Sequence, residues 1–128
     1  MLWGVHLPKC ILIVDDSAAI RAAIRSFLNE SGFDVCGEAV DGYDAIQKAE
    51  ELKPDLILLD FAMPRVNGIE AAPILKKMLP DTPIVLLTSH YAAVHDFSAL
   101  PIGIDAVVPK DGGLSMLLRY VETLMQVR

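Results

Sequence analysis

The chain has 128 residues, of which 53% are hydrophobic and 22% are charged, and its formal net charge at pH 7 is -6. This length suits a single domain with one core, and no apolar run approaches the roughly 18 residues that a membrane-spanning helix requires. The acidic balance argues against direct nucleic-acid binding by this domain, because phosphate contacts need clustered Lys and Arg side chains.

Residues 1–8 look like a leader before the domain proper, which we place at residues 9–128. Nothing in the leader has the pattern of a secretory signal, so we expect a cytoplasmic protein without a membrane segment. Cys10 and Cys36 are too few and too far apart for a disulfide scaffold or a metal cluster. Because both lie in apolar, strand-like contexts, we expect them to be reduced core residues.

A strand and a helix open the predicted domain. Residues 10–14 form a short β-branched apolar run, which is typical of a strand. The acidic pair Asp15-Asp16 follows at once, and Ser17 can cap the helix whose apolar residues recur at helical spacing. Gly32 then ends this helix.

A second strand and a second helix come next. The strand is expected over residues 33–39. Asp41-Gly42 turns into a helix whose apolar residues lie on one side, and the helix ends before Pro54.

The third strand, residues 56–60, has four apolar residues and ends in Asp60. A continuous apolar run is typical of a strand that is covered on both faces of a parallel sheet. Asn67-Gly68 then makes a turn before a third helix. Pro73 removes a backbone hydrogen bond inside that helix, so we expect a late helix start or a kink.

The remaining elements follow the same alternation. A fourth strand over residues 83–87 brings Thr88 to its carboxyl end, and a short helix is expected at about residues 91–100. A fifth strand over residues 104–108 precedes Lys110. The buried stripe of the last helix is predicted to comprise Leu114, Leu117, Leu118, Val121, Leu124 and Met125.

Five strands alternating with five helices predict right-handed crossovers and a doubly wound α/β fold, a parallel sheet with helices on both faces. The carboxyl ends of parallel strands meet at one edge of the sheet. The side chains expected there are Asp15, Asp16, Asp60, Thr88 and Lys110. Two carboxylates about 5 Å apart repel by roughly 3 kcal/mol at an effective dielectric near 20, so three together need a cation. A set of oxygen ligands favours Mg²⁺.

Each of these residues also has an ordinary structural explanation. Asp15-Asp16 could only cap the first helix, where negative charge suits the helix dipole. Lys110 could be a solvated loop lysine, and Thr88 a hydroxyl at a strand end. The joint occurrence of these residue types at the ends of different strands favours a functional site.

Four segments carry a resemblance to a known family. They are Val14-Asp15-Asp16-Ser17, Asp60-Phe61-Ala62-Met63-Pro64-Arg65-Val66-Asn67-Gly68, Thr88-Ser89 and Lys110. The D-x-x-M-P-x-x-N-G pattern of the second segment is the most specific. Together, over about residues 9–126, they resemble the CheY-like receiver domain of bacterial two-component response regulators. The resemblance implies a single (βα)5 domain with a flavodoxin-like strand order of 2-1-3-4-5.

The resemblance also implies roles for the carboxylates. Asp60 would be the phosphoacceptor, attacking a phosphohistidine on a partner histidine kinase. Asp16 would bind Mg²⁺ directly and Asp15 through water. Asp60 and the carbonyl of Ala62 would complete the protein ligands of the ion.

By the same resemblance, Lys110 would hold the phosphoryl group, and Thr88 would donate its hydroxyl to that group and bias a two-state element. Two features depart from the family pattern. Val107 stands where many members have an aromatic residue that moves with the threonine. Pro109 precedes the lysine and Asp111 follows it, whereas many members have proline after the lysine.

Ala62 and His90 occupy positions that in this family tune how water reaches the phosphoryl group. Small Ala62 leaves room for an attacking water, and His90 could position that water or be a surface loop residue. Three functions remain open: a phosphorylated switch, an aspartyl-phosphate phosphatase and a receiver-like interaction module that is not phosphorylated. Phosphatases usually carry a second Asp where Ala62 stands, whereas Val107 gives the interaction module some support.

The partners implied by the resemblance are a sensor histidine kinase and an output domain or downstream protein. A homodimer is a further expected assembly. The chain is either a stand-alone receiver or part of a longer regulator, and its catalysis would be limited to its own aspartyl phosphorylation and dephosphorylation.

Overall fold

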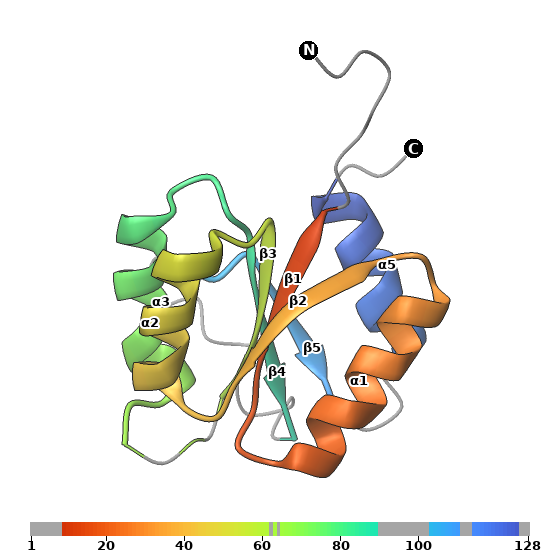
Figure 1. The fold of residues 1–128 in the computed structure, drawn as a ribbon, viewed down its shortest axis with the longest axis horizontal. Helices are drawn as coiled ribbons and strands as arrows, with labels where there is room; N and C mark the ends of the chain where they lie inside the picture. The colour runs from red at the N-terminus through yellow and green to blue at the C-terminus, as the bar shows by residue number, and fades with distance from the viewer. Residues whose placement is uncertain (1–8, 62, 64, 90–102, 111–113, 126–128) are drawn as a thin grey trace.

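A computed structural model describes residues 9–61, 63, 65–89, 103–110 and 114–125 of the chain. Five parallel strands form one sheet in the order β2-β1-β3-β4-β5 (Figure 1). The strands are β1 (Cys10–Val14), β2 (Asp34–Ala39), β3 (Leu56–Asp60), β4 (Ile84–Thr88) and β5 (Ala106–Pro109). The predicted α/β fold class and the strand order implied by the family resemblance are both confirmed.

Helices cover both faces of this sheet. They are α1 (Ala18–Glu30), α2 (Gly42–Leu52), α3 (Gly68–Met78) and α5 (Leu114–Leu124). In Figure 1, α1 and α5 lie against one face and α2 and α3 against the other. The helix expected at about residues 91–100 lies outside the described residues.

The core consists of two apolar clusters, one on each face of the sheet. Alternate residues of β3 belong to different clusters, because side chains of a strand point to opposite faces. Leu56 and Leu58 pack toward α1 and α5, whereas Ile57 and Leu59 pack toward α2 and α3. All five β3 residues are buried, as the continuous apolar run predicted. Each buried Leu or Ile contributes about 1.5–3 kcal/mol, which makes β3 a rigid support for Asp60.

The helix starts follow from their capping residues. The hydroxyl of Ser17 accepts a hydrogen bond from the backbone N–H of Ile20 at 3.3 Å, so the predicted cap of α1 is confirmed. Asn67 forms a capping box with Glu70 at the start of α3. Asn67-Gly68 is therefore the cap and first residue of the helix.

Of the two alternatives expected for α3 because of Pro73, the late start is wrong, whereas the kink stays a prediction. The helix begins at Gly68 and continues through Pro73 to Met78. The capping box satisfies the first backbone donors of α3, and Pro73 lies on its exposed side, where its ring does not displace core residues.

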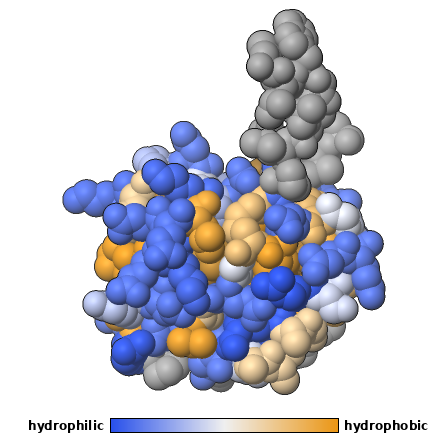
Figure 2. Space-filling model, viewed as in Figure 1, coloured by the Kyte–Doolittle hydropathy of each residue, from blue (hydrophilic) through white to orange (hydrophobic). Residues whose placement is uncertain are grey.

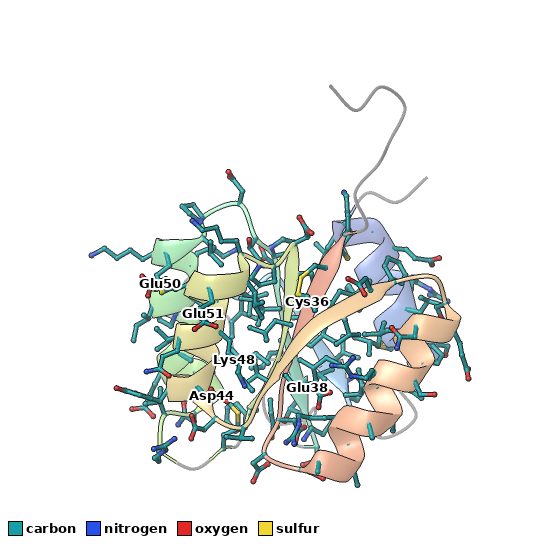
Figure 3. All side chains as sticks on the ribbon, in the orientation of Figure 1. Cys36, Glu38, Asp44, Lys48, Glu50 and Glu51 are labelled. Carbon is teal, nitrogen blue, oxygen red and sulfur yellow. A yellow bond between two sulfur atoms is a disulfide. The ribbon has the colours of Figure 1, made fainter. Side chains whose placement is uncertain are left out.

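The expectation of reduced core cysteines is also wrong, because Cys10 and Cys36 form a disulfide and both are partly exposed. The strands β1 and β2 are neighbours in the sheet, and their register shifts between Ile11 and Leu12, where Cys36 is the extra residue. This brings the two Cα atoms to 5.3 Å, within the range of disulfides. Figure 3 shows the bond beside the labelled Cys36. The pairing of β1 with β2 thus brings together two cysteines that are 26 residues apart in the sequence.

The last helix has the predicted stripe with one correction. Leu117, Val121 and Met125 are buried, and Leu118 and Leu124 are partly buried against them. Leu114, the first residue of the helix, is 41% exposed, because only part of its side chain packs against neighbours.

Hydrophilic residues predominate on the face shown in Figure 2, with hydrophobic residues interspersed. None of the helices among the described residues has the length and apolar character needed to cross a lipid bilayer.

Candidate functional site

The site lies at the carboxyl edge of the parallel sheet, where β1, β3 and β4 end and β5 leads into Lys110. Val14 pairs with Leu59 and Asp60 pairs with Leu87, so the ends of β1, β3 and β4 are in register. The residues that follow or end these strands include Asp15, Asp16, Asp60 and Thr88. Parallel pairing therefore gathers side chains that the sequence separates widely.

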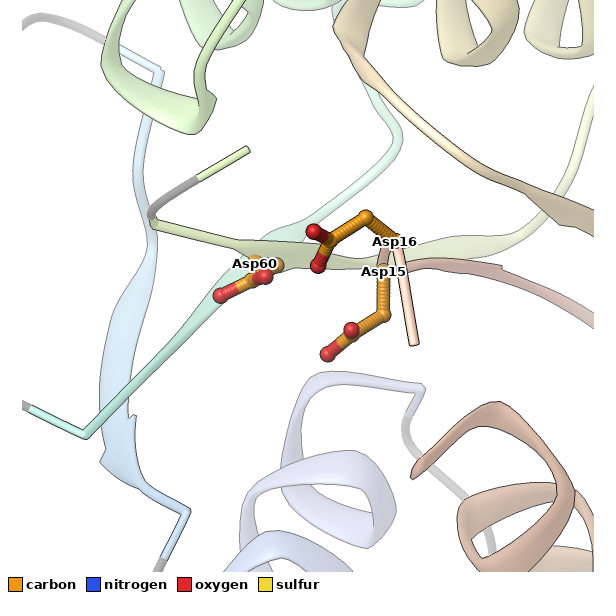
Figure 4. Close-up of side chains that lie close together, drawn as sticks. All are labelled: Asp15, Asp16 and Asp60. Carbon is orange, nitrogen blue, oxygen red and sulfur yellow. The ribbon is translucent and has the colours of Figure 1, made fainter. Parts of the chain in front are cut away.

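Three carboxylates form the acidic part of the site. One oxygen from each of Asp15, Asp16 and Asp60 lies within 4.8 Å of the others (Figure 4). Asp15 is fully buried and Asp60 is 3% exposed, whereas Asp16 lies on the surface. Carboxylates this close repel one another, more strongly where burial excludes water.

Lys110 supplies a positive charge to the two buried carboxylates. Its Nζ lies 2.8 Å from Oδ2 of Asp15 and 3.0 Å from Oδ1 of Asp60. Burial would lower the pKa of Lys110, but its close interactions with the negative charges of both aspartates outweigh burial and raise the pKa above its ordinary value. The ammonium is therefore charged at physiological pH and is positioned between Asp15 and Asp60.

The backbone holds Lys110 in this position. Its N–H donates to the carbonyl of Thr88 at 2.9 Å, directly after Pro109 pairs with Thr88 as the last residue of β5. The strand β5 is at the edge of the sheet and has a neighbouring strand on one side only. A proline is tolerated in such a strand because its missing N–H can face the side without a neighbour. Pro109 is therefore compatible with a lysine that reaches the carboxylates.

Asp15 has one oxygen committed to the turn and one directed at the site. Oδ1 accepts the backbone N–H of Ser17 at 2.9 Å. Oδ2 is buried and accepts no hydrogen bond of good geometry from the described residues, although Lys110 is within ion-pair distance. The two observations are compatible, since an ion pair needs less directional geometry than a hydrogen bond. A buried carboxylate oxygen with spare acceptor capacity, next to two further carboxylates, fits a hard divalent cation.

Thr88 completes the edge of the site as the last residue of β4 and is 1% exposed. Between β3 and β4, the N–H of Phe61 donates to the carbonyl of Leu87 at 2.9 Å. This bond continues the pairing of the two strands just past Asp60. A Cβ at Gly68 would collide with the carbonyl oxygen of Asp60, so α3 begins in close contact with the end of β3.

One residue near the site was not anticipated from the sequence. Arg21 donates from Nη1 to the carbonyl of Asp15 at 2.7 Å, and its Nε pairs with Glu38 at 2.9 Å. The guanidinium thus ties the acidic turn to β2. A basic residue in the first turns of a helix that follows an acidic turn is a weak sequence signal, and its partner on β2 is visible only in the fold.

The remaining predicted residues divide into two groups. Val107 is partly buried in β5 against the cluster under α2 and α3. Ala62 and His90 lie outside the described residues.

The chain matches the model of the response regulator receiver domain family over residues 11–122. Among curated proteins, it is 44% identical over 105 residues to the response regulator protein VraR of Staphylococcus saprophyticus. That match covers 81% of this chain and 50% of the relative, so the chain spans about half the length of the curated relative.

Solved structures agree with this match. The response regulator domain of Thermotoga maritima CheB has a TM-score of 0.81 at 31% identity, covering 95% of this chain and 99% of that one. The response regulator TrrA of Thermotoga maritima, solved in complex with Mg²⁺-BeF, has a TM-score of 0.81 at 33% identity, covering 91% of this chain and 98% of that one. The chain therefore belongs to the response regulator receiver domain family.

Proposed function

We propose that this receiver domain is a phosphorylatable switch in which Asp60 accepts a phosphoryl group from a histidine kinase in the cytoplasm. The observation that carries the proposal is the position of Asp60, a buried carboxylate beside Asp15 and Asp16 with Lys110 Nζ 3.0 Å from its Oδ1. This combination of a nucleophile, further carboxylates and a lysine matches what phosphoryl transfer needs, which is positioning and charge neutralisation.

In the proposed step, a carboxylate oxygen of Asp60 forms a bond to phosphorus while the bond from phosphorus to the kinase imidazole nitrogen breaks. The imidazole leaves with the electron pair and takes up a proton from solvent. Asp60 becomes an acyl phosphate, and hydrolysis by water later restores the carboxylate and releases phosphate. The domain catalyses only this modification of itself.

Asp15, Asp16 and Asp60, with the carbonyl of Ala62, would hold Mg²⁺. The fit rests on the grouped carboxylate oxygens and on the spare acceptor capacity of Asp15 Oδ2. The relative TrrA was solved with Mg²⁺-BeF, which supports the same ion here. When bound, Mg²⁺ would supply positive charge that offsets the carboxylates and the incoming phosphoryl oxygens.

Lys110 and Thr88 would act on the phosphoryl group after its arrival. Lys110 already pairs with Asp60, so its ammonium can neutralise charge on the transferred oxygens without moving far. Thr88 ends the adjacent strand and would donate its hydroxyl, which would change the chain that follows β4 and thereby alter partner affinity. Because Val107 replaces the usual aromatic residue, we place the switch on Thr88 and the following segment.

The proposed partners are a sensor histidine kinase and an output domain or downstream protein, and a homodimer is a further proposed assembly. The relative VraR is about twice as long as the matched region, which leaves room for an output region in a longer regulator. Turnover of free phosphate esters is not proposed, because Ala62 stands where an acid/base carboxylate would be required.

Incubation with acetyl phosphate and Mg²⁺ tests the proposal. Intact-mass spectrometry should show one added phosphoryl group on the wild-type chain and none on Asp60→Asn. As a matched control, Asp34→Asn changes an exposed aspartate at the start of β2 and should be phosphorylated like the wild type. If the wild-type chain gains no more mass on incubation than Asp60→Asn does, the chain is an interaction module without phosphorylation.

A further inference from the structure

The N-terminus of α2 lies against the loop that joins β3 to α3. Asp41 caps α2 with Oδ1, which accepts the backbone N–H of Asp44 at 2.7 Å. Its other oxygen, Oδ2, accepts Nε of Arg65 at 2.7 Å and also Nη2 of Arg65. The Asp41 side chain is 4% exposed and that of Arg65 is 65% exposed. The buried carboxylate of Asp41 thus contacts both α2 and the loop between β3 and α3.

Two further contacts hold the same loop to α2. The N–H of Gly42 donates to the carbonyl of Val66 at 2.9 Å, and a Cβ at Gly42 would collide with Val66. The guanidinium of Arg65 lies over the ring of Tyr43, 5.6 Å from its centroid. The chain comes this close to α2 because position 42 carries no side chain.

Arg65 also has a backbone conformation that side chains disfavour. Its φ is 64°, in the left-handed region, where a non-glycine residue costs about 1 kcal/mol or more. Surrounding contacts must offset this cost. The ion pair with Asp41 and the contact with Tyr43 are the contacts that do so among the described residues.

The base of the loop is closed beside Asp60. The N–H of Gly68 donates to the carbonyl of Phe61 at 3.1 Å, and Phe61 is itself paired to β4. The loop is therefore joined to the sheet at its base and to α2 at its tip. Ala62, whose carbonyl is a proposed cation ligand, belongs to this loop.

We propose that the Asp41–Arg65 ion pair is a latch that holds the β3–α3 loop for cation binding at the carboxylate cluster. Asp41 and Arg65 are positioning residues in this scheme, which rests on the cation site of the proposed function. A loop that is already ordered loses less conformational freedom when a ligand binds, so the latch increases the affinity for the cation. Breaking it should weaken binding without removing any ligand.

An NMR titration of the isotope-labelled full chain with Mg²⁺ tests the latch by following backbone amides of the site. Asp41→Asn keeps the oxygen that caps α2 but removes the charge that pairs with Arg65, and Arg65→Gln removes the cation. We expect each variant to raise the Kd for Mg²⁺ about three- to tenfold, less than the loss usually seen for direct supports of metal ligands. The double variant should be no weaker than the weaker single variant, because both changes break the same contact.

Lys76→Gln is the matched control. It removes an ion pair at 2.9 Å between Lys76, near the end of α3, and Asp105, neither of which contacts the carboxylate cluster or the Asp41–Arg65 pair. Its Kd for Mg²⁺ should stay within about twofold of the wild-type value. Arg65→Lys restores charge without the two-nitrogen contact and should give an intermediate Kd.

Amide hydrogen exchange gives a readout that does not depend on the cation. In Asp41→Asn and Arg65→Gln, the N–H of Gly42 should exchange faster, because its bond to the Val66 carbonyl opens with the loop. The N–H of Ile13, in the interior strand β1, should keep its wild-type rate. Faster exchange at both amides would mean general destabilisation and would overturn the latch.

Other outcomes are equally decisive. An unchanged Kd in both single variants, an equal loss in Lys76→Gln, or no Mg²⁺ binding by the wild type would each overturn the latch. A wild-type chain that binds Mg²⁺ but gains no phosphoryl group would refute the proposed function alone. Normal phosphorylation at saturating Mg²⁺ with the predicted change in Kd supports both.

Discussion

At the scale of single residues, the site depends on how buried charges are compensated. Asp15 and Asp60 are almost completely buried, and Lys110 lies within 3.0 Å of an oxygen of each. Removal of the lysine would leave two buried carboxylates without their shared cation, which is costly in a poorly hydrated environment. Lys110 is therefore a structural counter-charge to both aspartates, and in the proposed mechanism it would also hold the phosphoryl group.

Asp41 offers a residue-scale prediction on pH. The backbone N–H of Asp44 has the largest effect and, together with Arg65, holds the pKa of Asp41 below its ordinary value of 3.8 despite burial. The unfolded chain therefore takes up this proton at a higher pH than the folded chain. The stabilising contribution of Asp41 is complete well above pH 3.8 and is lost as the pH falls through the folded pKa.

The measurement is urea unfolding of the wild type and Asp41→Asn. At about pH 6 the free energy of unfolding of the wild type should exceed that of Asp41→Asn. This difference should shrink as the pH is lowered to about pH 3. Glu38, whose pKa is also lowered by Arg25 and Arg21 against the opposing effect of burial, is present in both proteins and cancels in the comparison. A constant difference between the two proteins across this range would contradict the prediction.

At the scale of elements, the disulfide joins β1 to β2 and encloses all of α1. Its two cysteines are 26 residues apart, and closing a loop of that length in the unfolded chain stabilises the fold by about 3.5 kcal/mol in the chain-entropy model. Reduction with dithiothreitol should lower the free energy of unfolding by an amount of this order. It should leave the proposed phosphorylation of Asp60 intact, because Cys10 begins β1 and Cys36 lies in the first half of β2, whereas Asp60 ends β3 at the carboxyl edge.

Equilibrium unfolding with and without reductant, followed by circular dichroism, measures this effect. The double variant Cys10→Ser and Cys36→Ser should resemble the reduced wild type and should not respond to dithiothreitol. If the oxidised and reduced wild-type proteins unfold at the same urea concentration, the disulfide does not stabilise the chain.

At the scale of the whole molecule, the carboxyl edge combines stability with function. Three carboxylates within 4.8 Å oppose folding, and a bound cation would remove that opposition. Mg²⁺ should therefore stabilise the folded chain, by about 2.7 kcal/mol at a concentration 100 times the Kd. The increase in Tm should disappear when EDTA is added.

Asp16→Asn separates the repulsion among the carboxylates from the stabilisation by bound Mg²⁺. It should lose most of the increase in Tm with Mg²⁺, yet in EDTA it should be at least as stable as the wild type, because one repelling charge is gone. Differential scanning calorimetry of both proteins with Mg²⁺ and with EDTA measures this. An equal increase in Tm for Asp16→Asn and the wild type would show that Mg²⁺ acts elsewhere.

Local patterns in the chain predicted most of the fold. The apolar run of β3 indicated burial on both faces, and Ser17 and Gly32 marked the limits of α1. Helix starts were less certain, because Asn67-Gly68 has the composition of a turn and only the reciprocal bonds with Glu70 make it a cap. Leu114 matched the helical stripe by spacing, but its exposure depends on where the helix begins relative to the sheet.

What the sequence by itself determined is the order of elements and the chemistry at each strand end. The alternation of strand and helix patterns predicts a parallel sheet. The carboxyl ends of parallel strands lie at one edge, which places Asp15, Asp60 and Thr88 together. The tertiary structure decided the pairings that no periodicity encodes. The bulge in β2 joins the two cysteines, and the approach of α2 to the β3–α3 loop pairs Asp41 with Arg65. The physical reason is that such contacts depend on the separation and register of elements distant in sequence, which only the packed core sets.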